Sequence, residues 1–273
     1  MLIIILFALL GLCFGSWFNV VVFRGMETER THCKGQRSEC PKCGHKLGVL
    51  DLIPVFSWLF LGGECRYCKE KISWVYPVGE ALTAIGFTLV GIEVAGFWES
   101  YNGIWDMRYI PSILMLAISL LTVIVLSIST ISDLREKTVF VMPIYLGMVA
   151  IIIVRVLQIL TEKELLGMMF SANLWWGRLG VFVGMFITFI ALSRLLANKV
   201  GGGDFDIVLL LYCSGFVNCV FNSLFIASIV GCVIALFMRL IKKWDRQTTI
   251  PMVPLLYVGY LAQMYITCLS IPF

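Results

Sequence analysis

Two aspartates stand beside long apolar segments of the sequence. Asp133 comes directly after the run Ile110–Ser132, and Asp204 follows Gly201-Gly202-Gly203 at the start of another run. An ionisable side chain at the end of a membrane helix is costly to bury unless it faces a cavity or a partner. Where two carboxyl groups meet they share a proton, so one can take a proton from water while the other donates one to a carbonyl oxygen. The two aspartates therefore predict amide hydrolysis without a covalent intermediate.

The surroundings of the two aspartates bear on this hypothesis. The glycines before Asp204 carry no Cβ, which lets a peptide substrate approach the backbone closely. The alternative is that both aspartates are ordinary interfacial acids, and Arg135 and Lys137 beside Asp133 fit a solvated loop. Taken alone, each aspartate is more often structural than catalytic.

Four cysteines form two pairs in a polar stretch after the first apolar run. The pairs are Cys40-Pro-Lys-Cys43 and Cys65-Arg-Tyr-Cys68, with 21 residues between them, and this spacing is close to the usual four-cysteine zinc pattern. Four thiolates leave no open position on the metal, so the predicted zinc is structural. The alternative of two disulfides is disfavoured in a reducing cytoplasm. Three nearby residues are alternative ligands but are predicted to be ordinary surface residues: His32, Cys33 and His45.

The composition indicates a membrane as the solvent. Hydrophobic residues make up 60% of the 273 residues and charged residues 14%, and the mean hydropathy is +0.93. A water-soluble domain of this size cannot cover its surface with so few charges. The apolar runs are long enough to cross about 30 Å of hydrocarbon. We predict an all-α polytopic membrane protein with a small cytoplasmic four-cysteine zinc-binding insert.

About eight transmembrane helices are expected. They are Leu2–Phe23, Val75–Phe97, Ile110–Ile131, Val139–Leu160, Leu174–Ala197, Phe205–Val220, Phe221–Ile241 and Ile250–Ser270. The first run has no basic flank before it, so it is predicted to be a retained helix and not a cleaved signal peptide. The chain then divides into a first transmembrane helix (residues 1–24), a zinc-binding domain (25–74) and a transmembrane domain with both aspartates, the aspartyl protease domain (75–273).

The 21 Lys and Arg residues predict the orientation in the membrane. With the N-terminus outside, all of them fall on the cytoplasmic side except Arg108, Arg155, Lys163 and Arg178. A shift of the topology by one helix destroys this bias. The zinc-binding insert, Asp133 and Asp204 are therefore all predicted at the cytoplasmic face. The net charge of +4 reports orientation and does not indicate binding to nucleic acid.

Motifs along nearly the whole chain resemble one family. The first apolar run closes with the motif Phe14-Gly15-Ser16-Trp17-Phe18-Asn19 and continues to Arg24. Between the cysteine pairs stands the motif Leu52-Ile53-Pro54-Val55-Phe56-Ser57-Trp58-Leu59. After the second pair comes the motif Ile72-Ser73-Trp74-Val75-Tyr76-Pro77-Val78-Gly79-Glu80. Gly201-Gly202-Gly203-Asp204 matches the pattern GxGD, and Asp133 matches a first catalytic acid. In this order the landmarks resemble the bacterial type IV prepilin peptidases, which are membrane aspartyl proteases.

This resemblance implies a concrete activity. Asp133 and Asp204 would be the catalytic pair that cleaves the basic leader of a prepilin or pseudopilin on the cytoplasmic side of the bacterial inner membrane. Members with a four-cysteine domain often also methylate the new N-terminus with S-adenosylmethionine. That activity rests on the resemblance alone, because the sequence has no glycine-rich dinucleotide fingerprint. Three further residues match family positions and are predicted to support substrate binding: Asn19, Arg24 and Glu80.

The sequence departs from the family pattern at two places. Asp206 stands where the family usually has a basic residue, and it is expected to point away from the site. Pro251-Met252-Val253-Pro254 replaces Pro-Phe-Gly-Pro, which puts a close approach of the backbone there in doubt. Neither change removes a catalytic acid.

Two other functions are alternatives. A presenilin-like intramembrane aspartyl protease would share the GxGD motif but would not need the zinc insert. A transporter or scaffold would use the intramembrane acids for protons and the zinc module for a partner. The expected partners of the favoured reading are a single apolar helix with a basic leader, as substrate, and membrane lipids.

Overall fold

The computed structural model describes residues 1–26, 38–40, 42–100, 110–166, 180, 183–184, 187, 191, 202–240 and 251–269. The elements are α1 (Leu2–Met26), the 3₁₀-helix η1 (Val49–Asp51), α2 (Phe56–Phe60), α3 (Val75–Ser100), α4 (Ile110–Glu136), α5 (Val141–Leu166), α7 (Gly202–Leu240) and α8 (Met252–Leu269). Apart from two isolated β-bridges in the insert, the described residues form helices and turns. The predicted all-α class is confirmed.

Six helices in the described part of the chain are long and apolar enough to cross a membrane. They are Leu2–Gly25, Val75–Trp98, Ile110–Glu136, Val141–Thr161, Val220–Leu240 and Met252–Leu269. Each matches a predicted span within a few residues. The predicted fifth span, Leu174–Ala197, lies almost wholly outside the described residues. The predicted sixth, Phe205–Val220, forms the first part of α7.

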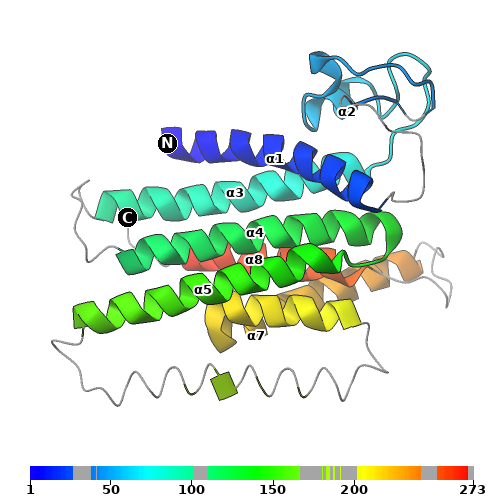
Figure 1. Ribbon diagram of the computed structural model, residues 1–273. Helices are drawn as coiled ribbons and strands as arrows, with labels where there is room; N and C mark the ends of the chain where they lie inside the picture. The colour runs from blue at the N-terminus through cyan, green and yellow to red at the C-terminus, as the bar shows by residue number, and fades with distance from the viewer. Residues whose placement is uncertain are drawn as a thin grey trace.

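Helix α7 corrects the predicted break between the sixth and seventh spans. The structure gives one helix of 39 residues where two were expected, and a straight helix of that length would measure about 58 Å, nearly twice the hydrocarbon thickness. Its second half runs antiparallel to α8, with Ser223 against Gly259 and Gly231 against Leu255. Since Asp204 lies at the same end of the bundle as the start of α8, α7 reverses direction. Figure 1 draws its two halves, yellow and orange, as separate arms.

A buried arginine holds the first half of α7. Arg155 of α5 is only 2% exposed, although the charge count assigned it to the outer side of the membrane. Its guanidinium donates hydrogen bonds to Gln158 Oε1 at 2.8 Å and to the carbonyl oxygen of Ser214. A charge inside a bundle requires such acceptors. Arg155 therefore joins α5 to the segment that precedes the reversal of α7.

The other helices form one bundle around an apolar core. Helix α1 packs chiefly on α3, α4 contacts both α3 and α5, and α8 packs against α7 and α4. Helices α1 and α3 lie so close that a Cβ added to Gly11 would stand 2.7 Å from the Cα of Ala84, and one added to Gly15 would stand 2.8 Å from the Cα of Glu80. Small residues allow this approach between membrane helices. The main core cluster joins α3, α4, α5, α7 and α8, and Figure 1 shows them as roughly parallel rods.

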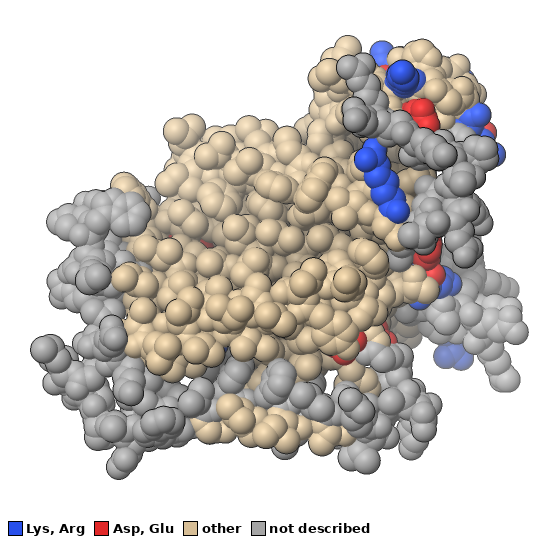
Figure 2. Space-filling view, in the orientation of Figure 1, with Lys and Arg blue, Asp and Glu red and all other residues tan. Residues whose placement is uncertain are grey.

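The insert stands at one end of the bundle, beyond the carboxyl end of α1 (Figure 1). Figure 2 shows that the visible Lys and Arg side chains gather over this end, while the broad side of the bundle is almost free of charge. An apolar band with positive charge at one end is the arrangement expected of a multi-pass membrane protein. The carboxyl end of α4, with Asp133, lies at this same end of the bundle.

Candidate active site and metal centre

Asp133 lies in the last turn of α4 and is only 6% exposed. Its Oδ2 accepts a hydrogen bond at 3.1 Å from the backbone N–H of Val253, in the first turn of α8. The first N–H groups of a helix have no partner within the helix, so a carboxylate there both satisfies a donor and meets the positive end of the dipole. Only the backbone of Val253 is used. The valine in place of glycine therefore does not prevent the close approach that the sequence put in doubt.

Asp204 lies in the first turn of α7 and is half-buried. Its carboxyl group lies near enough to that of Asp133 for the two to interact electrostatically. The structure thus brings together the two predicted acids, which are 71 positions apart in the sequence.

The glycine before Asp204 has a packing role that the sequence did not indicate. A Cβ on Gly203 would meet the Cβ and Cγ2 atoms of Val139 at 2.8 Å. Val139 lies in the short turn between α4 and α5, six positions after Asp133. Gly203 therefore lets α7 begin against this turn and so brings Asp204 to Asp133. Of the other two glycines, Gly202 begins α7 and Gly201 lies outside the described residues.

Asp206 turns away from this pair. The hydroxyl of Tyr145, on α5, donates to its carboxylate oxygens at 3.3 and 3.4 Å. Residues two positions apart on a helix do not face the same way. The position of Asp206 agrees with the expectation that it lies outside the site.

The four cysteines of the insert form a cluster. The sulfur atoms of Cys40, Cys43, Cys65 and Cys68 lie within 4.8 Å of one another, and all four are free thiols. The Cys40 and Cys68 sulfurs are 3.9 Å apart, which is close to the separation of about 3.8 Å that a tetrahedral Zn–S distance of about 2.3 Å implies. The described thiols form no disulfide. The cluster therefore suits one tetrahedral metal ion.

The two cysteine pairs have the same backbone geometry. Cys40 N–H donates to the carbonyl of His45, and Gly44 N–H donates to the carbonyl of Cys40. Around the second pair, Cys65 N–H donates to the carbonyl of Glu70 and Lys69 N–H to the carbonyl of Cys65. Gly44 has φ +67° and Lys69 has φ +59°, so both turns pass through the left-handed region. In the second turn the N–H groups of Cys68 and Tyr67 lower the pKa of Cys65 to about 7. These N–H groups therefore favour the thiolate form of Cys65, which is the form that binds metal.

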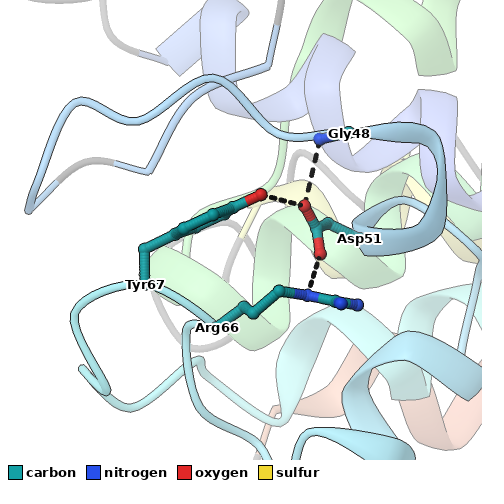
Figure 3. Close-up of polar contacts among 4 residues, drawn as sticks. All are labelled: Gly48, Asp51, Arg66 and Tyr67. Carbon is teal, nitrogen blue, oxygen red and sulfur yellow. Dashed lines mark hydrogen bonds and ion pairs between the residues drawn. The ribbon is translucent and has the colours of Figure 1, made fainter.

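An aspartate that the sequence analysis missed ties the insert together (Figure 3). Asp51 Oδ2 accepts hydrogen bonds from Gly48 N–H at 3.0 Å and from the Tyr67 hydroxyl at 3.2 Å, and Oδ1 lies 2.7 Å from Arg66 Nε. Arg66 and Tyr67 are the two residues between Cys65 and Cys68. Asp51 thereby joins η1 to the second cysteine turn. An acid inside the apolar stretch Val49–Ile53 was the available signal.

The other predicted ligands and supporting residues are placed as follows. His45 stacks on Tyr67, with ring centroids 3.6 Å apart, and lies outside the four-sulfur cluster. His32 and Cys33 lie outside the described residues. Arg24 lies at the end of α1 and lines a cavity beside the insert.

Glu80 connects the insert to α3, and Asn19 joins α1 to α3 beside it. Glu80 is 8% exposed, and its Oε2 accepts the backbone N–H of Val55 at 2.7 Å. Val55 precedes α2 and has φ +61°, a strained value for a β-branched residue. Asn19 on α1 donates to the carbonyl of Tyr76 at 3.3 Å and also contacts Glu80. The structure therefore shows Glu80 in contact with the insert.

Comparison with known proteins places this arrangement in context. Residues 9–94 match the family described as the Bacterial Peptidase A24 N-terminal domain. The Prepilin leader peptidase/N-methyltransferase of Pseudomonas aeruginosa is 26% identical over 284 residues, which cover 94% of this chain and 88% of that protein. This chain is similar to a prepilin leader peptidase over nearly its whole length.

Other relatives match a shorter part of the chain at higher identity. The Prepilin leader peptidase/N-methyltransferase of Myxococcus xanthus is 45% identical over 78 residues, 29% of this chain and 23% of that protein. The Type 4 prepilin-like proteins leader peptide-processing enzyme of Escherichia coli is 37% identical over 98 residues, 30% of this chain and 36% of that protein. These two alignments thus span well under two thirds of the relatives' lengths. No solved structure matches the chain. The resemblance read from the motifs is confirmed.

Proposed function

We propose that this chain is a membrane aspartyl endopeptidase that removes the basic leader of a prepilin or pseudopilin, with Asp133 and Asp204 as the catalytic pair. The observation that carries the proposal is that these two carboxyl groups, one from the end of α4 and one from the start of α7, lie within electrostatic range of each other. The names of the relatives supply the substrate class.

The geometry suggests a different role for each acid. Val253 N–H donates to Oδ2 of Asp133, and such a hydrogen bond favours the ionised carboxylate. Asp133 is then the base that takes a proton from water, and Asp204 holds the proton that passes to the scissile carbonyl oxygen. The water oxygen attacks the carbonyl carbon, and collapse of the tetrahedral intermediate releases the amine with a proton. No covalent bond to the enzyme forms.

The four-cysteine cluster is proposed to hold a structural zinc ion through Cys40, Cys43, Cys65 and Cys68. Sulfur spacing and the lowered pKa of Cys65 support this choice. With four sulfur ligands the ion takes no part in hydrolysis. The proposed division of the chain is a first transmembrane helix, residues 1–24, a zinc-binding domain, 25–74, and the aspartyl protease domain, 75–273.

The proposed location is the bacterial inner membrane, with the insert and the acids on the cytoplasmic side. The grouping of Lys and Arg at the end that carries both features supports this orientation (Figure 2). A substrate with one apolar helix and a basic leader would lie in the bilayer beside α4 and α7, with its leader on the same side as the acids. Asn19, Arg24, Glu80 and the glycines 201–203 are proposed to support this site.

The two alternatives are less well supported. A presenilin-like protease would have no use for the insert, yet the family match covers α1, the insert and most of α3. A transporter or scaffold does not require two acids to meet at a helix N-terminus.

Cleavage of a purified prepilin, followed by mass spectrometry of its N-terminus, tests the proposal. Wild-type protein should remove the leader. Asp133→Asn and Asp204→Asn should each reduce the rate at least about 10³-fold, because removal of either member of a catalytic pair disables the pair. Asp206→Asn, two positions from Asp204 but facing Tyr145, is the matched control and should retain most of the activity. Equal rates for all three variants would refute the assignment.

A further inference from the structure

The insert has an apolar surface that neither the metal centre nor the hydrolytic site uses. Within Leu50–Phe60, which covers most of η1 and all of α2, six large hydrophobic side chains are exposed: Leu50, Leu52, Ile53, Phe56, Leu59 and Phe60. The two short helices lie against each other, so these side chains form one patch, which we call the apolar face of the insert. Proteins rarely leave such a patch in water, and one that is exposed marks a contact with a partner or a membrane.

Helix α2 turns its apolar side outward. Phe56, Leu59 and Phe60 recur at the spacing of one helix face, and Phe60 is 86% exposed. Ser57 and Trp58 lie away from this face and line the cavity beside the insert. The Trp58 indole N–H donates to a backbone carbonyl of the insert at 3.1 Å, which fixes this orientation. The arrangement is the reverse of a surface helix in a water-soluble domain, which buries its apolar side.

The start of α2 lies level with the membrane-spanning part of α3. Val55, which precedes α2, donates its N–H to Glu80 Oε2 at 2.7 Å. The span of α3 begins at Val75, and the five positions from there to Glu80 correspond to about 7.5 Å of helix. Trp74, directly before the span, is 56% exposed and is of a residue type enriched at membrane interfaces. The apolar face is therefore held beside the edge of the hydrocarbon layer.

The charges of the insert lie away from this face. In Figure 2 the visible charged side chains of the insert lie on its outer side, while the part over α2 carries none. The stretch Leu50–Phe60 contains one charged residue, Asp51, and its side chain is only 7% exposed and pairs with Arg66. A surface that is apolar on one side and charged on the other is suited to lie in the interface of a bilayer.

We propose that the apolar face of the insert docks into the lipid leaflet on its own side of the membrane, with Phe56, Leu59 and Phe60 at the boundary between headgroups and acyl chains. The occupant is lipid and not a substrate helix, because Figure 1 shows α1 and the insert on one side of the bundle and α7, which carries Asp204, on the other. Docking requires only that the bundle span a membrane, so it is independent of the peptidase assignment. It also accounts for the apolar character of the motif between the cysteine pairs.

Photocrosslinking in vesicles tests the docking. Full-length protein with p-benzoylphenylalanine in place of Phe60 is reconstituted into vesicles of phosphatidylethanolamine and phosphatidylglycerol, irradiated and digested for mass spectrometry. The probe replaces one exposed aromatic side chain by another, so the fold should persist, and protease resistance equal to that of the wild type checks this. The peptide that contains position 60 should gain the mass of a phospholipid. The matched control has the probe in place of Lys42, whose side chain is 67% exposed, and should give at least about tenfold less lipid adduct.

A second variant makes the test independent of the probe. Leu59→Gln with Phe60→Gln puts two polar side chains into the proposed contact, and the backbone amides of residues 49–60 should then exchange hydrogen at least about tenfold faster in vesicles than those of the wild type. Lys42→Gln is the control and should leave this exchange unchanged.

Either of two negative results would overturn the proposal: equal lipid adducts at positions 60 and 42, or equal exchange in the double variant and the wild type. A crosslink from position 60 to an added prepilin, or to a second copy of the chain, in place of lipid would also overturn it and would identify a protein as the occupant of the apolar face.

Discussion

At the residue scale, the site depends on backbone contacts that only the fold reveals. Asp133 is predictable as an acid beside a membrane segment, but its hydrogen bond to Val253 joins residues 120 positions apart. The family resemblance marked the stretch Pro251-Met252-Val253-Pro254 as a family motif but gave no physical reason for it. The physical reason is that the start of α8 presents an unpaired N–H to a carboxylate.

Gly203 provides a prediction at this scale. Gly203→Ala should place a methyl group against Val139, separate α7 from the α4–α5 turn and lower the cleavage rate about tenfold or more, since overpacking costs roughly 1–3 kcal/mol. Val139→Ala combined with Gly203→Ala should restore most of the rate. The measurement is the rate of leader removal for the single and double variants. An equally slow double variant would show that Gly203 instead admits substrate, as the sequence first suggested.

Asp51 provides a pH-dependent prediction. The Gly48 N–H holds the pKa of Asp51 below its ordinary value of 3.8, with added contributions from Tyr67 and Arg66. A depressed pKa stabilises the fold above the ordinary value and loses that effect as pH falls through the folded pKa. The insert should therefore unfold on acidification below about pH 4 more steeply in wild type than in Asp51→Asn. Circular dichroism and proteolysis from pH 6 to 3 would measure this. Parallel curves for the two proteins would exclude a role for the Asp51 carboxylate.

At the element scale, most helices follow from the apolar runs alone. Six predicted spans match described helices, because about 20 consecutive apolar residues in a membrane can satisfy their backbone only as a helix. The reversal of α7 was expected, but the uninterrupted helix was not. The polar residues around Asn218 suggested a loop, and composition does not distinguish a loop from a sharply bent helix.

The insert provides the prediction for this scale. Helix α2 has five residues and η1 has three, too few to persist without a metal or a core. Metal analysis should find one zinc ion per chain. Removal of the ion by a chelator, or Cys40→Ser with Cys43→Ser, should expose the insert to proteolysis. Protection that is unchanged after removal of the metal would show that the insert folds without it.

At the scale of the whole molecule, charge and hydropathy predicted the architecture better than any single motif did. The distribution of Lys and Arg predicted Asp133, Asp204 and the insert at one face, and the structure places the insert and the carboxyl end of α4 at one end of the bundle (Figure 1), where the visible Lys and Arg side chains gather (Figure 2). The cavity could not be foreseen in this way. Its walls come from α1, the insert and α3, and its shape depends on how Glu80 holds the insert on α3 and how Asn19 joins α1 to α3.

The most direct test of the account is a crosslink between the two acid positions. In a protein with Asp133→Cys and Asp204→Cys, a short thiol-specific bifunctional reagent should join the two cysteines, and mass spectrometry of the digested protein would identify the linked peptides. Asp133→Cys with Asp206→Cys is the matched control and should give little product, because position 206 faces Tyr145. A strong link to position 206 and none to position 204 would contradict the claim that the carboxyl groups of α4 and α7 work as a pair.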